Sequence, residues 1–149
     1  MRALVANRQR AVRVRPAALR RAALAAMSAE GCASGSEASI AVVSDAQIRA
    51  LNRRYLGCDR TTDVLAFAQD GPGGLLGDVV VSAERAAAQA PRYGQTVEGE
   101  LELLVIHGML HLLGYDDATG PARARMRRRE RAILGALGRT TARRRRAGR

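Results

Sequence analysis

The chain has 149 residues, which suits one compact domain, and its aromatic content of 3% predicts a core built from alanine, valine, leucine and isoleucine. Its apolar runs are much shorter than the ~20 residues that cross a bilayer, and Cys32 and Cys58 are too few for a disulfide framework. These features exclude a membrane-spanning or disulfide-stapled protein and indicate a cytoplasmic one, while the net charge of +11 favours a polyanionic partner.

Strands and helices are predicted in alternation along the first half of the chain. Apolar and β-branched runs predict strands at residues 2–6, 39–44, 62–68 and 76–81. Capping residues, among them Asp45 and Thr96, and helix-forming composition predict helices at residues 17–27, 45–55, 83–90, 96–113 and 121–137. A glycine-rich turn at 70–74 would allow the strands beside it to pair. We expect one α/β domain over residues 1–138 and a disordered basic tail over residues 139–149.

The positive charge is concentrated near the C-terminus. Residues 1–119 contain 13 arginines and 13 acidic residues, whereas residues 120–149 contain 12 arginines and one acid, Glu130. Such a block favours RNA or DNA as a partner, because arginine pairs with phosphate and displaces condensed counterions. The alternative is a solvated tail, since the chain contains no lysine and uses arginine for every basic role. We interpret the tail as an extension that anchors RNA.

The two histidines of the chain, His107 and His111, lie four residues apart in the segment HGMLH. This spacing places both imidazoles on one face of the predicted helix, as two ligands of one metal ion require. The alternative is that two core or surface histidines share a face by chance, but the GYDD segment that follows at once favours a metal site. Zinc proteases of the HExxH type use the same spacing, but Gly108 replaces their catalytic glutamate, so peptide hydrolysis by that mechanism is not expected.

A catalytic zinc ion takes three protein ligands and keeps a fourth position for water, so a third ligand is needed. Gly114 would let the chain turn back toward the helix, which makes Asp116 and Asp117 the nearby candidates. The alternative for these aspartates is a capping or solvated position in the turn.

Three segments resemble, in the same order, the signatures of the YbeY family of endoribonucleases and rRNA maturation factors. HGMLHLLGYDD at 107–117 is similar to HGxLHLxGYDH, LNRRYLGCDRTTDVLAF at 51–67 to LNxxYRxxDxPTDVLSF, and LLGDVVVS at 75–82 to LGDIxIS. The last helix, with Met126 and Glu130, follows the same pattern. The resemblance covers residues 39–138 and is specific because it rests on three motifs.

The resemblance implies a single α/β domain with a small mixed sheet packed with helices. It further implies one zinc ion at the C-terminal end of a core helix, similar to the metal helix of metzincins, with Asp117 as third ligand beside His107 and His111. The implied activity is metal-dependent cleavage of single-stranded RNA in rRNA processing and ribosome quality control, with pre-rRNA and the ribosome or its 30S subunit as partners.

Two residues depart from the family pattern. Asp117 stands where the pattern has a histidine; a carboxylate can bind zinc, but it cancels one unit of charge and weakens the Lewis acid. Leu56 stands where the pattern has an arginine suited to a phosphate, and Arg53, Arg54 and Arg60 are candidate substrate-binding replacements. The alternative for these arginines is that they are solvated helix and loop residues.

The leading hypothesis is a zinc-dependent, single-strand-specific endoribonuclease that matures the 3′ end of 16S rRNA, with His107, His111 and Asp117 catalytic through the bound zinc. Arginines would fix the phosphate backbone, and either water or the substrate's 2′-hydroxyl would be the nucleophile. The competing hypothesis, favoured by Leu56 and Asp117, is a ribosome-associated binding factor with weak or no nuclease activity.

Overall fold

The computed structural model describes residues 1–69 and 74–138, and a four-stranded mixed sheet forms its centre. The strand order is β1-β2-β4-β3. The strands are β1 (Arg2–Asn7), β2 (Glu37–Val43), β3 (Val64–Ala68) and β4 (Leu75–Ser82). β1, β2 and β4 are parallel, whereas β3 pairs antiparallel with β4 at one edge, as the turn between these two strands predicts. The predicted α/β fold with a mixed sheet is confirmed.

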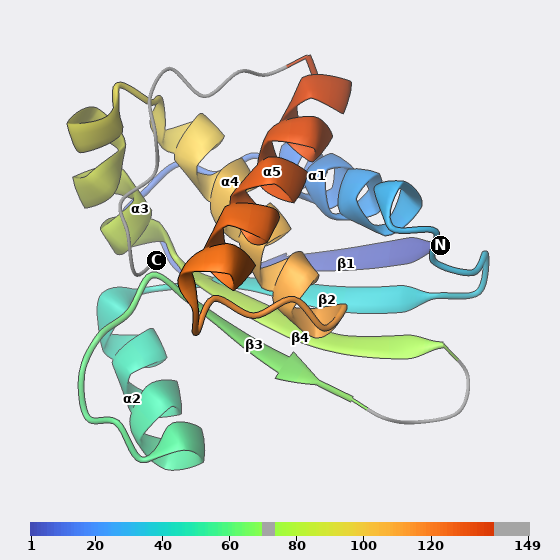
Figure 1. Ribbon diagram of the computed structural model, residues 1–149. Helices are drawn as coiled ribbons and strands as arrows, with labels where there is room; N and C mark the ends of the chain where they lie inside the picture. Colours follow the sequence, from blue (N-terminus) through green and yellow to red (C-terminus); the bar gives the residue numbers. More distant parts are fainter. Residues whose placement is uncertain (70–73, 139–149) are drawn as a thin grey trace.

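Helices cover the two faces of the sheet unequally (Figure 1). They are α1 (Pro16–Ala29), α2 (Asp45–Leu56), α3 (Ala83–Gln89), the short 3-10 helix η1 (Ala90–Tyr93), α4 (Val97–Leu112) and α5 (Gly120–Ala136). α1, α4 and α5 lie on one face, and α2 lies on the other (Figure 1). The larger apolar cluster therefore lies between the sheet and α1, α4 and α5, and a smaller one, around Ile48 and Val80, lies under α2.

α4 is the central helix of the larger cluster. Every residue from Gly99 to Leu110 is buried, which matches a segment that is apolar on nearly all sides. Gly108 lets this helix approach the sheet closely, because a Cβ atom at this position would lie 2.5 Å from Cγ1 of Val79 and 3.2 Å from Cγ2 of Val64. The backbone of α4 is therefore held directly against β4 and β3.

Most predicted elements agree with the structure to within two residues, and two differ in detail. The N-cap of α2 is Ser44 rather than Asp45, because the Ser44 hydroxyl accepts a hydrogen bond from the Gln47 amide and forms a capping box. The predicted helix at 83–90 ends at Gln89, and the chain continues as the 3-10 helix η1, which contains Pro91. The predicted tail and most of the glycine-rich turn lie outside the described residues. No described helix has the length and apolar character needed to span a bilayer.

Candidate metal centre

Two imidazoles and one carboxylate converge at the C-terminal end of α4. His107 and His111 project from the same side of the helix, and their Nε2 atoms are 3.2 Å apart. Oδ2 of Asp117 lies 3.8 Å from each of these Nε2 atoms. The three side chains offer one ligand atom each, all within 4.8 Å of one another, so this cluster could hold a metal ion. It is the single group of this kind within residues 1–69 and 74–138.

A tight turn brings Asp117 to the histidines. α4 ends at Leu112, and Gly114 adopts φ +99°, a conformation that glycine tolerates better than other residues. The turn is closed by the Tyr115 amide, which donates to the Leu110 carbonyl at 3.0 Å. Of the two candidate aspartates, Asp117 reaches the cluster, whereas Asp116 accepts a hydrogen bond from the Ala118 amide at 3.1 Å.

Hydrogen bonds at Nδ1 fix the orientation of both histidines. Nδ1 of His111 donates to the Tyr115 carbonyl at 3.0 Å, and since a carbonyl only accepts, the proton lies on Nδ1. Nδ1 of His107 lies 2.5 Å from Oε2 of Glu130, and both side chains are buried, with 4% of each residue exposed. With Nδ1 as donor in both rings, the Nε2 lone pairs point at the space beside Asp117, which is the arrangement that metal-binding histidines use.

The protonation of His111 also suits a metal ligand. Burial and the neighbouring His107 lower the pKa of the His111 imidazole, and Asp117 only partly opposes this shift. The neutral imidazole is the form that binds metal, because a protonated ring has no free lone pair. His111 is therefore neutral at neutral pH, which is the form that can bind a metal ion.

A second layer of contacts ties the turn to distant parts of the chain. The Tyr115 hydroxyl donates to Oε1 of Glu30 at 2.7 Å, and Nε of Arg129 donates to Oε2 of the same carboxylate at 2.7 Å. The hydrogen bond to Glu30 raises the pKa of the Tyr115 hydroxyl, which keeps it protonated as a donor. Glu30 follows the C-terminus of α1, so this helix and α5 hold the residue whose carbonyl orients His111.

Glu130 and Glu30 are site residues whose roles the sequence reasoning missed. The role of Glu130 is indicated by the sequence, because it is the single acid among 12 arginines. It also lies on the same side of α5 as the buried residues Ala122, Met126 and Ile133. A charged residue at a buried helical position needs a partner, and His107 supplies it. Glu30 carried no comparable signal, since its role depends on how α1 and α5 pack.

The pattern of the YbeY family, described as "Endoribonuclease YbeY", matches residues 4–138. The chain belongs to this family. A protein of Pelotomaculum thermopropionicum named endoribonuclease YbeY is 46% identical over 145 residues, covering 90% of this chain and 95% of that protein. Proteins of the same name from Chloroflexus aggregans and Moorella thermoacetica are 44% and 45% identical, covering 82% and 80% of this chain and 87% and 85% of theirs.

The fold is shared with a solved structure as well. The solution structure of TM1509 from Thermotoga maritima matches with a TM-score of 0.61 and 23% sequence identity, covering 91% of each chain. At this identity the likeness concerns the fold alone. The predicted resemblance to the YbeY family is confirmed by the family match and by the relatives above.

The arginines that were predicted to replace the missing YbeY arginine lie on or next to α2. Arg53 and Arg54 belong to the last turn of α2, on the sheet face opposite α4, and Arg60 follows in an exposed loop (Figure 1). The Arg54 guanidinium lies 5.3 Å from the ring centroid of Tyr55. Leu56 is 56% exposed. No hydrogen bond or ion pair within the described residues joins these side chains to the metal cluster, so their role in substrate binding stays a prediction.

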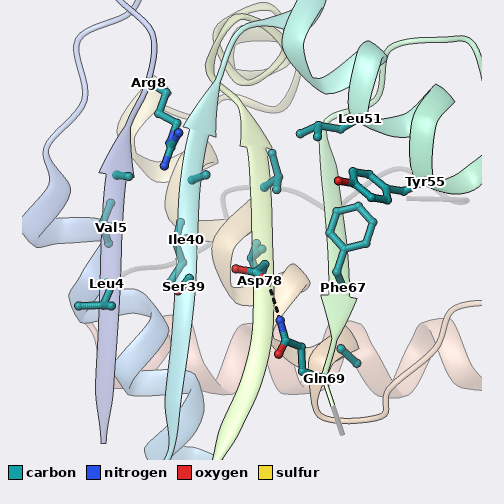
Figure 2. Close-up of a pocket in the computed structure, with 15 residues that line it drawn as sticks. Leu4, Val5, Arg8, Ser39, Ile40, Leu51, Tyr55, Phe67, Gln69 and Asp78 are labelled. Atoms are coloured by element: carbon teal, nitrogen blue, oxygen red, sulfur yellow. Dashed lines mark hydrogen bonds between the residues drawn. The ribbon is translucent and has the colours of Figure 1, made fainter. Parts of the chain in front are cut away.

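A groove of about 690 Å³ crosses the sheet face beside α2 (Figure 2). Tyr55 and Phe67 meet edge to face at its rim, with ring centroids 5.7 Å apart, and Arg8 lies at its other side. Its floor is formed by the open faces of the strands, where Gln69 donates to Asp78 at 3.3 Å. The groove contains none of the three residues of the metal cluster.

Proposed function

We propose that this chain is a zinc-dependent endoribonuclease that cleaves single-stranded RNA, matures the 3′ end of 16S rRNA and takes part in ribosome quality control. The observation that carries the proposal is the cluster of His107, His111 and Asp117 in a chain whose named relatives are endoribonucleases. Since rRNA precursors are made in the bacterial cytoplasm, the proposal places the protein there, with pre-rRNA and the 30S subunit as partners.

The donor set suits zinc. Two neutral imidazoles and one carboxylate are ligands that catalytic zinc sites use, and three protein ligands leave a position open. Both histidines have Nδ1 engaged, by Glu130 and by the Tyr115 carbonyl, so each can offer Nε2. When bound at His107, His111 and Asp117, zinc would supply a Lewis acid for a phosphoryl oxygen and would favour deprotonation of a nearby nucleophile.

The side chains around the cluster have separate tasks in this proposal. Glu130 holds the ring of His107, and its negative charge makes Nε2 a stronger donor. Asp117 neutralises part of the metal charge, so cleavage is expected to be slower than with a third histidine. Arg53, Arg54 and Arg60 are proposed to bind the phosphate backbone away from the cleaved bond.

The test is cleavage of a single-stranded RNA, with the matched duplex as control. Wild type, His107→Ala and Asp117→Ala are purified identically, so that a contaminating nuclease appears equally in all three. We expect cleavage that is abolished by a chelator, restored by zinc and lost in both variants. Asp117 is half-buried in a surface turn outside the apolar core, so its replacement is expected to leave the core intact and to separate loss of the ligand from loss of the fold. Equal cleavage in all three proteins would refute the proposal.

A binding factor without strong nuclease activity is the second candidate, and the exposed Leu56 in place of an arginine favours it. In that case Asp117→Ala would leave ribosome association unchanged, and no zinc-dependent cleavage would be detected. Sedimentation with 30S subunits, measured on the same protein preparations, distinguishes the two functions.

A further inference from the structure

α5 presents a row of exposed and half-buried arginines with few counter-charges. Its 17 residues contain six arginines and one acid, Glu130, which is buried against His107. Arg129 pairs with Glu30. The other five arginines, Arg123, Arg125, Arg127, Arg128 and Arg131, form no ion pair with any residue that the structure describes. The solvent side of α5 therefore carries uncompensated positive charge, and we call these five residues the α5 arginines.

The helix period decides where these side chains lie. Ala122, Met126 and Ile133 point inward and are buried, whereas Arg125, Arg128 and Arg131 are exposed. At 3.6 residues per turn, Arg123 and Arg127 lie roughly 120° and 160° around the helix from Arg129, which faces α1 through Glu30. The α5 arginines thus cover the outer side of the helix and the flank that faces away from α1.

This surface begins at the metal centre. The guanidinium of Arg123 donates to the backbone carbonyl of Asp117 at 3.1 Å, so the first turn of α5 touches the loop that carries the third ligand. Arginine has five N–H donors, and this contact uses one of them. From Arg123 to Arg131 the helix rises about 12 Å, so the positive surface leads away from the cluster over more than two turns.

The chemistry of the surface fits a phosphate backbone better than a lipid surface. A helix that binds in a membrane interface exposes bulky apolar side chains beside its cations. The outer residues of α5 near the arginines are small, namely Ala124, Ala132, Gly135 and Ala136, and its large apolar side chains are buried in the core. Arginine without bulky apolar neighbours binds phosphates through charge and forked hydrogen bonds.

We propose that the α5 arginines bind the backbone of the RNA strand on one side of the cleaved bond and lead it to the metal centre. The proposal rests on the proposed function, because it assigns the polyanion to RNA. It adds a binding surface on the same side of the sheet as the cluster, whereas Arg53 and Arg54 lie on the opposite side.

The test is the salt dependence of binding to a single-stranded RNA, measured by fluorescence anisotropy with a chelator present so that the RNA stays intact. The full-length chain carries Arg125→Ala, Arg128→Ala and Arg131→Ala together. Alanine is the strongest helix former, so α5 is expected to remain folded, which circular dichroism checks. Each phosphate contact contributes about 0.7 to the slope of log affinity against log salt, so losing three contacts should reduce the slope by about 2.

A charge-matched control carries Arg10→Ala, Arg20→Ala and Arg21→Ala, three exposed arginines outside α5. We expect the slope of the control to stay near that of wild type. An equal change in both triple variants, or no change in the α5 variant, would overturn the proposal. So would an α5 variant that binds RNA normally but no longer binds vesicles containing phosphatidylserine.

The cleavage assay separates this proposal from the proposed function. If wild type does not cleave RNA but the α5 variant shows a smaller slope of log affinity against log salt, the RNA-binding surface is supported and the nuclease function is refuted. If wild type cleaves RNA and the α5 variant has the same salt dependence as wild type, the nuclease function is supported and the RNA-binding surface is refuted.

Discussion

Glu130 is a single residue on which the proposed metal centre is expected to depend. Its carboxylate lies 2.5 Å from Nδ1 of His107, and both groups are buried. Glu130→Gln keeps the size of the side chain but removes its charge, so we expect zinc affinity to fall about 10- to 100-fold with the fold retained. Competition with a fluorescent chelator measures the affinity. Glu37→Gln, which removes a half-buried carboxylate that pairs with Arg2 far from the cluster, is the control, and equal affinities in both variants would contradict the assigned role.

The Tyr115 hydroxyl connects the metal-site turn to Glu30 through a charged hydrogen bond of 2.7 Å. Tyr115→Phe removes this bond and leaves the Glu30 carboxylate with Arg129 alone. We expect the free energy of unfolding to fall by about 1.5 kcal/mol, the lower end of the range for hydrogen bonds to charged groups, because this bond is only partly buried. Urea denaturation measures it. Tyr55→Phe alters a tyrosine that is 57% exposed and should change stability by no more than about 0.5 kcal/mol; a similar loss in both variants would count against the link.

Among the elements, α4 is held by a close approach to the sheet. Gly108→Ala would place a methyl group 2.5 Å from Cγ1 of Val79, whose branched side chain is stiff. We expect this change to lower the free energy of unfolding by about 1–3 kcal/mol, as overpacking does. Val79→Ala in the same chain should recover part of the loss, and thermal unfolding of the single and double variants measures both effects.

Gly135→Ala is the matched control for this prediction. Gly135 is helical, in α5, and nothing lies within 4 Å of a Cβ atom built there. The substitution should stabilise the protein by about 0.5–1 kcal/mol, because alanine is the better helix former. If both alanine substitutions shifted the unfolding temperature in the same direction, the close contact at Gly108 would not be what sets its cost. The same contact explains why the glutamate of HExxH proteases has no room at this position.

Local sequence signals sufficed for most elements and for the two histidines of α4. The Thr96 cap, the buried apolar run and Gly114 each act within a few residues, so the helix that carries His107 and His111 follows from the sequence. Asp117 could not be separated from Asp116 by spacing alone, because both follow the same turn. Which aspartate reaches the histidines depends on the path of the turn after Gly114. The resemblance to the YbeY family, rather than the spacing, indicates Asp117.

The contacts that complete the site join residues far apart in the chain. Glu30 and Tyr115 are separated by 85 positions, and their meeting depends on how α1 and α5 pack against α4. No local pattern encodes such packing, so Glu30 could not be predicted. The burial of Glu130 could be predicted, because it is an isolated acid on the buried side of an arginine-rich helix.

For the whole molecule, the candidate metal centre lies at the end of an aliphatic core, and we expect this core to stay folded without a metal ion. The buried cluster of α1, α4, α5 and the sheet is aliphatic and extends well beyond the cluster of ligands. We expect the metal-free protein to keep its far-UV circular dichroism. Zinc at about 100 times its dissociation constant should add about 2.7 kcal/mol to the free energy of unfolding. Thermal unfolding with a chelator and with zinc measures this gain, which should vanish in His107→Ala; unfolding on chelation would show that zinc is structural.

The turn that carries Asp117 keeps its shape without the side chain of Asp117. Arg123 donates to the carbonyl of Asp117, and the Ala118 amide donates to the Asp116 carboxylate. Gly114 sets the direction of the chain. None of these contacts uses the Asp117 side chain. The identity of the side chain at position 117, the proposed third ligand, is thereby uncoupled from the shape of the loop. Codons for aspartate and histidine differ at a single base, and a lineage could exchange one for the other without passing through a misfolded intermediate. With zinc bound as proposed, the strength of the Lewis acid would then change through one position, while the scaffold around it stays the same.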